Sequence, residues 1–259
     1  MTLRSRFLSF SLIAGLIGLF VQGAAAQQDP VHVIASNGMK AVIEELQPRI
    51  EKSIGHPLSI EYGSTAGLMR KIDAGAGFDA VILTSDAIRQ LAKEAKVNAD
   101  TRVDFARCGV GLAVRSGAPK PDIGTSAAMK KTLQQAPSIS YAKDGASRVY
   151  IDKMLERLGI AEEMKSKALL TQGSGPAMAS VAEGKTAVVM TLISELLPVR
   201  GIDVVGPFPA GLQNYVSFGA AVGAKASQPD GAKELIVFLK SPEAAPVYKA
   251  KGMERVAGK

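Results

Sequence analysis

Short runs of β-branched and apolar residues alternate with amphipathic stretches along most of the chain. From residue 31 to residue 96 the order is strand, helix, strand, helix, strand, helix. The strands are expected at 31–35, 58–62 and 78–84, and the helices at 38–55, 66–76 and 86–96. The first helix repeats apolar residues at i, i+3 and i+4 spacing, as in Val42, Leu46 and Ile50. This alternation predicts a parallel sheet covered by helices.

The second half of the chain contains another strand and helix unit. Strands are expected at 108–117, 138–142, 186–192, 202–208 and 214–224, and helices at 147–159, 177–185 and within 230–252. We therefore predict an α/β protein of two lobes, with parallel-rich sheets and helices on both faces. Lobe 1 would be 27–106 plus 217–259 and lobe 2 would be 107–212. Two strands, near 107–115 and 213–217, would cross between the lobes as a hinge.

The first 26 residues do not fit this pattern. Arg4 and Arg6 precede an apolar run at 7–21, and small residues follow at Ala24 and Ala26. This order is typical of a cleavable signal peptide, with cleavage after Ala26 and a periplasmic mature protein. The alternative is a membrane anchor, but the run is short for a spanning helix, which needs about 20 apolar residues.

Charge and composition limit the classes of molecule that the chain is expected to bind. The net charge is +7, the charges are dispersed and aromatic residues make up 5% of the chain. No basic cluster indicates nucleic acid binding, whereas a modest positive field favours a small anion. The single cysteine, Cys108, lies in an apolar stretch and is expected in the core. We expect a monomer.

Four expected helix starts share one chemistry. Each combines serine with small residues, in ASNGM at 35–39, YGSTAG at 62–67, DGASRV at 144–149 and QGSGPAM at 172–178. A helix start offers free N–H groups and a partial positive charge, and a serine hydroxyl adds one donor. Any one serine can be an ordinary helix cap. Four of them, at the ends of strands in both lobes, predict a shared anion cleft.

Catalytic and metal-binding patterns are weak by comparison. His32 and His56 have no evident acid or nucleophile partner, and no His/Cys cluster suits zinc. A phosphate loop with the spacing G-x-x-x-x-G-K-[ST] is absent from the sequence. We expect a binding protein, not an enzyme, with no cofactor and no resident metal.

Three stretches carry a family resemblance. VIASNGMKAVIEEL, YGSTAGLMRKIDAGAGFDAVILTSD and LIVFLKSPEAAPVYKAKGM resemble the periplasmic molybdate-binding proteins of ABC transporters, which have the type II solute-binding fold. The similarity covers nearly all of the chain after the signal segment. It implies that a tetrahedral oxyanion is held in the interlobe cleft and delivered to a membrane permease.

The resemblance also assigns site residues. It places Ser36 and Ser64 as hydroxyl donors, with Asn37 and Thr65 beside them. In lobe 2 it places Ser147 and Gly175 at main-chain donors.

The sequence departs from the family at two positions. Where the family has a tyrosine after its Val-Val strand, this chain has Met190 and then Thr191, which replaces the tyrosine only if the register shifts by one. Arg148 stands where the family has a small residue, and a guanidinium suits a carboxylate. The expected ligand is therefore molybdate or tungstate, with a di- or tricarboxylate held by Arg148 as the alternative and an exported enzyme as a weaker one.

Overall fold

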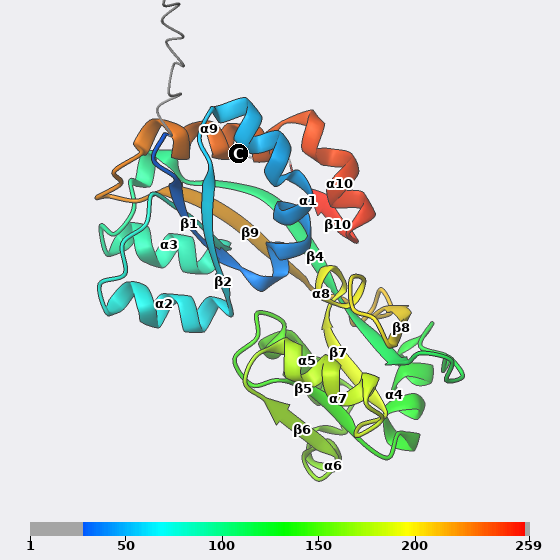
Figure 1. Ribbon diagram of the computed structural model, residues 1–259. Helices are drawn as coiled ribbons and strands as arrows, with labels where there is room; N and C mark the ends of the chain where they lie inside the picture. The colour runs from blue at the N-terminus through cyan, green and yellow to red at the C-terminus, as the bar shows by residue number, and fades with distance from the viewer. Residues whose placement is uncertain (1–27, 257–259) are drawn as a thin grey trace, which may run out of the picture.

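A computed structural model describes residues 28–256 as two α/β bodies joined by crossing strands (Figure 1). The predicted signal peptide at 1–26 lies outside the described residues. No helix between residues 28 and 256 is long and apolar enough to cross a membrane.

The first body is built on three parallel strands in the order β2, β1, β3. Each strand runs into a helix that packs on the sheet, as the hydrophobic pattern predicts. The elements are β1 Val31–Ser36, α1 Asn37–Ile54, β2 Leu58–Gly63, α2 Thr65–Asp73, β3 Ala80–Thr84 and α3 Ser85–Lys93. The end of the chain returns to this body as α9 Pro229–Lys240, α10 Ala245–Ala250 and β10 Met253–Arg255.

The second body is built on parallel strands in the order β7, β5, β6. Its elements are α4 Ser126–Gln135, β5 Ile139–Ala142, α5 Arg148–Arg157, α6 Ala161–Lys165, β6 Ala168–Thr171, α7 Ser174–Ala182, β7 Val188–Leu192, α8 Ile193–Leu196 and β8 Ile202–Pro207. The elements α4, α6, α8 and β6 were not among those expected from the sequence.

Strand β4, Val103–Arg115, passes from one body into the other. Its first half pairs antiparallel with β9, Tyr215–Val222, as far as Gly109, and from Val110 onward it pairs with β7 and β8. The sheets are therefore parallel within each body and antiparallel where the chain crosses. The change of partner falls inside the predicted hinge strand at 107–115, while the lobe limits themselves stay a prediction.

A close approach at the junction fixes the start of α1. A Cβ added to Gly38 would lie 2.6 Å from Phe218 Cζ and 2.8 Å from Leu192 Cδ1. The Ser194 hydroxyl also donates to the Gly38 carbonyl over 2.8 Å. Glycine therefore allows helix α1 of the first body to rest directly on β9 and on the end of β7.

Cys108 is buried in this junction, as predicted. The pKa of its thiol is raised to about 11, chiefly by burial. The thiol is therefore a neutral packing group near pH 7. Nearby, Phe105 and Tyr248 are fully buried, with ring centroids 6.2 Å apart. The core thus continues from the first body into the crossing strands.

Candidate functional site

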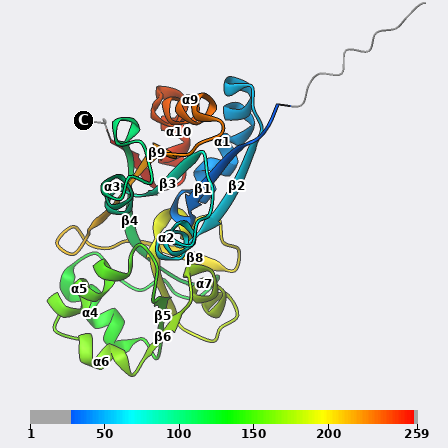
Figure 2. The ribbon, with the colours of Figure 1, turned by 90° about the vertical axis from the view of Figure 1, so that its left-hand side faces the viewer.

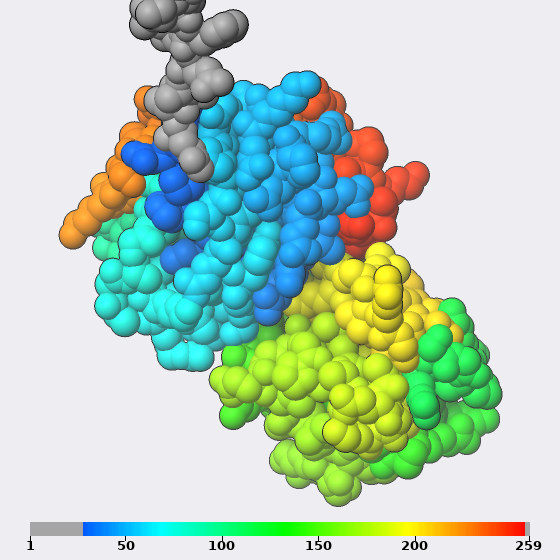
Figure 3. All heavy atoms as spheres, in the orientation of Figure 1, coloured from blue at the N-terminus to red at the C-terminus, as the bar shows by residue number. Residues whose placement is uncertain are grey.

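The four serine-bearing turns lie where parallel strands end and helices begin, at the junction of the two bodies. Figure 2 shows the start of α2 close to the second body, and Figure 3 shows an indentation between the bodies. Hydrogen bonds link the turns in series, from the first turn to the second, the second to the third and the third to the fourth. The folded chain therefore brings together segments that the sequence separates by up to 137 positions, from Ser36 to Gly173.

Ser36 precedes α1 and is 2% exposed. Its side chain makes no capping bond to the helix. Instead, the Thr65 hydroxyl donates to Ser36 Oγ over 3.3 Å. The Ser36 proton has no acceptor within hydrogen-bond distance among residues 28–256, so it is available for a ligand.

Ser64 is a helix cap and also an interlobe contact. Its oxygen accepts from the Gly67 N–H over 3.1 Å, which caps α2. Its hydroxyl donates to Asp144 Oδ2 in the second body over 2.9 Å. The ordinary cap interpretation therefore holds for Ser64, and its proton already has an acceptor.

Asp144 opens the third turn and joins three of the turns. Besides the Ser64 hydroxyl, its carboxylate accepts the Gly173 N–H over 2.7 Å and the Gln172 amide over 3.4 Å. Gly173 is the residue before α7, so Asp144 sits where a helix start would otherwise attract an anion. The sequence analysis did not single out this carboxylate, although it lies inside a quoted motif.

Ser147 and Thr191 form the hydroxyl pair of the second body. They are 3% and 1% exposed, and their oxygens lie 3.4 Å apart. Ser147 makes no capping bond to α5. Met190, in contrast, is 0% exposed within the larger hydrophobic core, because successive strand residues point to opposite faces.

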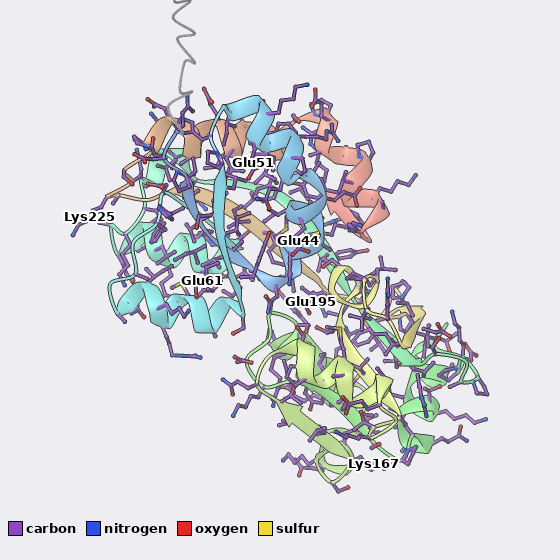
Figure 4. All side chains as sticks on the ribbon, viewed as in Figure 1. Glu44, Glu51, Glu61, Lys167, Glu195 and Lys225 are labelled. Atoms are coloured by element: carbon purple, nitrogen blue, oxygen red, sulfur yellow. The ribbon has the colours of Figure 1, made fainter. Side chains whose placement is uncertain are left out.

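A cavity of about 600 Å³ is lined by residues of both bodies. The start of α1 lines it with Asn37 and Lys40, and the second body lines it with Gly175 and Glu195. The Lys40 ammonium is 3.7 Å from Glu44 and 5.6 Å from the centre of the Tyr62 ring. Figure 4 places Glu195 at the junction of the two bodies, near the first turns of α1.

Glu195 is a carboxyl group that the sequence analysis missed. The Thr191 hydroxyl donates to its Oε2, and no ion pair to it occurs among residues 28–256. Burial is the largest influence on Glu195 and raises its pKa, although the hydroxyls of Thr191 and Ser174 and the Leu192 N–H act against it. It is therefore a partly buried acid with neutral partners at the edge of a cavity.

A second cavity, of about 500 Å³, lies at the starts of α2 and α3. Thr65, Ser85 and Arg89 line it from the first body, and Ala146 and Tyr150 from the second. The Arg89 side chain forms an ion pair with Asp86 and lies 4.0 Å from Asp104. Asp144 lines the same cavity, which therefore has one cation, Arg89, against three carboxylates and a net negative charge.

Arg148 is engaged away from both cavities. Its Nε donates to Asp152 Oδ2 over 2.6 Å, one helical turn along α5. Its guanidinium lies 5.2 Å from the centre of the Tyr141 ring. Its guanidinium is thus already paired in this structure, and the carboxylate fork at Arg148 stays a prediction.

Residues 31–254 match the family described as bacterial extracellular solute-binding protein. The chain belongs to this family.

The individual relatives of the chain carry different names. The chain is 32% identical to aconitate isomerase of a Pseudomonas species over 239 residues, which cover 90% of each chain. It is 28% identical to the molybdate-binding protein ModA of Azotobacter vinelandii over 257 residues, 95% of this chain and 98% of that one.

A solved structure has the same fold. The periplasmic molybdate-binding protein of Azotobacter vinelandii aligns with a TM-score of 0.75 at 16% identity, covering 88% of this chain and 100% of that chain. The predicted resemblance and the predicted type II solute-binding fold are thus confirmed. The solute-binding role is shown for the family, whereas the ligand is not fixed by these relatives.

Proposed function

We propose that this solute-binding protein captures a small anion in the cleft between its lobes. The carrying observation is the series of four linked helix starts, which concentrates hydroxyl and N–H donors from both lobes. A ligand bridging them gains contacts that exist only when the lobes are together, and it therefore favours the closed state.

Within this proposal, molybdate or tungstate is the first candidate ligand. Ser36, Thr65, Ser147 and Thr191 are neutral hydroxyl groups, and Asn37 and Gly175 line one cavity. In this structure the Thr65 and Thr191 hydroxyls donate to Ser36 and Glu195, and a bound oxyanion would compete for these protons. Neutral donors satisfy an oxyanion by hydrogen bonds without a fixed counter-ion. The ModA relative named above supports the same ligand class.

A tricarboxylate is the second candidate, and one observation favours it specifically. The relative at 32% identity is named an aconitate isomerase. In this chain a carboxylate ligand would meet Lys40 or Arg89, which line the two cavities, in place of Arg148. If such a ligand is isomerised, the ionised form of Glu195 is the cleft group able to accept a proton from one carbon and return it to another.

The remaining parts of the proposal concern location and partners. The predicted signal peptide and the family's extracellular role support a periplasmic location. A membrane permease of an ABC importer would receive the anion from the closed monomer, and no cofactor would take part.

Calorimetric titration with molybdate, tungstate, sulfate, citrate and cis-aconitate tests the proposal. We expect one saturable site for either the oxyanions or the carboxylates. Incubation with cis-aconitate, followed by chromatography, separates binding from isomerisation. Absence of binding across the whole panel would contradict the proposal, and conversion of cis-aconitate would replace transport by catalysis.

The same titration with Arg148→Ala tests whether Arg148 holds the ligand. Because Arg148 is held by Asp152 and Tyr141, the variant should bind every anion of the panel within about twofold of the wild type. A loss of tenfold or more for citrate or cis-aconitate would restore Arg148 as a ligand residue.

A further inference from the structure

The hydroxyls of the second lobe are linked to Glu195. Thr191 donates its single proton to Glu195 Oε2. Since that proton is committed, the contact between Ser147 and Thr191, 3.4 Å between oxygens, requires Ser147 to be the donor. Both protons are therefore used within this series of hydrogen bonds, which ends on Glu195.

Protonation of Glu195 reverses this direction. A neutral carboxyl group has an O–H that can donate to Thr191 Oγ1. Thr191 then accepts from Glu195, and the protons of Thr191 and Ser147 are released for another acceptor. An anion in the cleft is such an acceptor, and it also repels a charged carboxylate nearby.

The charged groups around Glu195 do not supply a fixed counter-ion. Helix α1 faces the cavity with Lys40, Glu44 and Glu45, and Lys251 reaches it from the end of α10. Lys40 is 3.7 Å from Glu44, and Lys251 is 2.5 Å from Glu45, so the two cations are already paired. Among residues 28–256, Cys108 on β4 is a further titratable neighbour of Glu195, and its thiol is neutral near pH 7 because its pKa is raised.

We propose that the cleft takes up a proton on Glu195 together with the anion, so that Thr191 and Ser147 turn their hydroxyls toward the ligand. This inference rests on the proposed anion-binding function. Glu195 would be the residue that couples anion binding to pH, and the affinity for the anion would fall as the pH rises. The raised pKa of Glu195, caused first by burial, agrees with a carboxyl that is readily protonated.

The test is a proton count. Calorimetric titration of the full chain with molybdate, and separately with cis-aconitate, is carried out near pH 7 in two buffers of different ionisation enthalpy. The wild type should take up a measurable fraction of one proton per anion bound, and its affinity should fall by up to about tenfold per pH unit between the pKa of Glu195 in the free chain and its higher pKa in the anion complex. Glu195→Gln, which mimics the neutral acid, should bind without proton uptake and with a flat pH profile.

Glu44→Gln is the matched control, because Glu44 lines the same cavity but is paired with Lys40 on the surface of α1. This variant should keep the proton uptake of the wild type. Anion binding by the wild type with no proton uptake would overturn the inference and leave the proposed function standing, even if Glu195→Gln failed to fold. Unchanged uptake in a folded Glu195→Gln variant would also overturn it. Failure of the wild type to bind either anion would refute the proposed function, and this inference with it.

Discussion

Ser36→Ala removes the donor that the structure leaves most clearly available to a ligand. The hydroxyl is 2% exposed, makes no helix cap and accepts one weak contact, from Thr65 at 3.3 Å. Its loss should therefore cost the fold little, about 0.5–1.5 kcal/mol. Its proton has no acceptor among the described residues, so its main contribution is expected in the complex.

The loss in affinity follows from the charge of the ligand. A hydrogen bond to a charged acceptor contributes about 1.5–3 kcal/mol. Removing it should raise the dissociation constant by roughly 10- to 150-fold. The assay is calorimetric titration with the anion that the wild type binds in the panel, accompanied by thermal unfolding of each variant.

The control is Ser241→Ala. Ser241 follows α9 in the first body, and its Oγ is also buried without a partner among residues 28–256. The same chemical change outside the cleft should leave the dissociation constant unaltered. If folded Ser36→Ala binds within twofold of the wild type, the reasoning that Ser36 faces the anion is refuted.

Three further predictions concern the cleft, the fold and its pH dependence. Asp144→Asn should tighten anion binding on the order of fivefold, because it removes a negative charge whose repulsion of the anion costs on the order of 1 kcal/mol. The asparagine oxygen still accepts the hydrogen bond from Ser64. Weaker binding in the titration would contradict this prediction. The Asp79 carboxylate is 1% exposed and accepts from the N–H groups of His32, Ser227 and Gln228. Asp79→Asn should therefore lower the free energy of unfolding by about 2 kcal/mol at pH 7, as measured with urea. Burial raises the pKa of Asp79, but hydrogen bonds lower it overall, so its stabilisation exists above the unfolded pKa of about 4 and is lost as pH falls; an equal deficit at pH 3 would contradict this. Gly38→Ala should lower the free energy of unfolding in urea by about 1–3 kcal/mol, because the added methyl group meets two side chains within 3 Å. Gly77→Ala is the control and should be near neutral, because an added methyl group there meets nothing within 4 Å. Equal effects of the two substitutions would contradict this prediction.

Much of the fold could be read from local pattern. The strand at Val31–Ser36 and the helix at Asn37–Ile54 were predicted within one or two residues, because apolar periodicity and the glycine after the helix mark them. The strand Ala168–Thr171 was missed because it has four residues, with Leu169 and Leu170 exposed. Helix Ser126–Gln135 was missed because it buries little apolar surface, chiefly Met129 and Leu133.

The site could be predicted only as far as its chemistry is local. Serine at a helix start is a local signal, and the four turns that carried it do come together. The direction of a long side chain is not local, and Arg148 turns to Tyr141 and Asp152. Glu195 was not predicted as a site residue. Its role depends on the hydrogen bond from Thr191 and on its burial between the two bodies, and residue spacing in the sequence predicts neither.

A crystal structure of the chain with the anion that binds most tightly in the titration panel tests the interlobe site. The anion should lie between the linked helix starts, with the Ser36 and Ser147 hydroxyl oxygens within about 3.2 Å of its oxygens. An anion bound outside the interlobe cleft, or inside it without contact to either hydroxyl, would contradict the central claim.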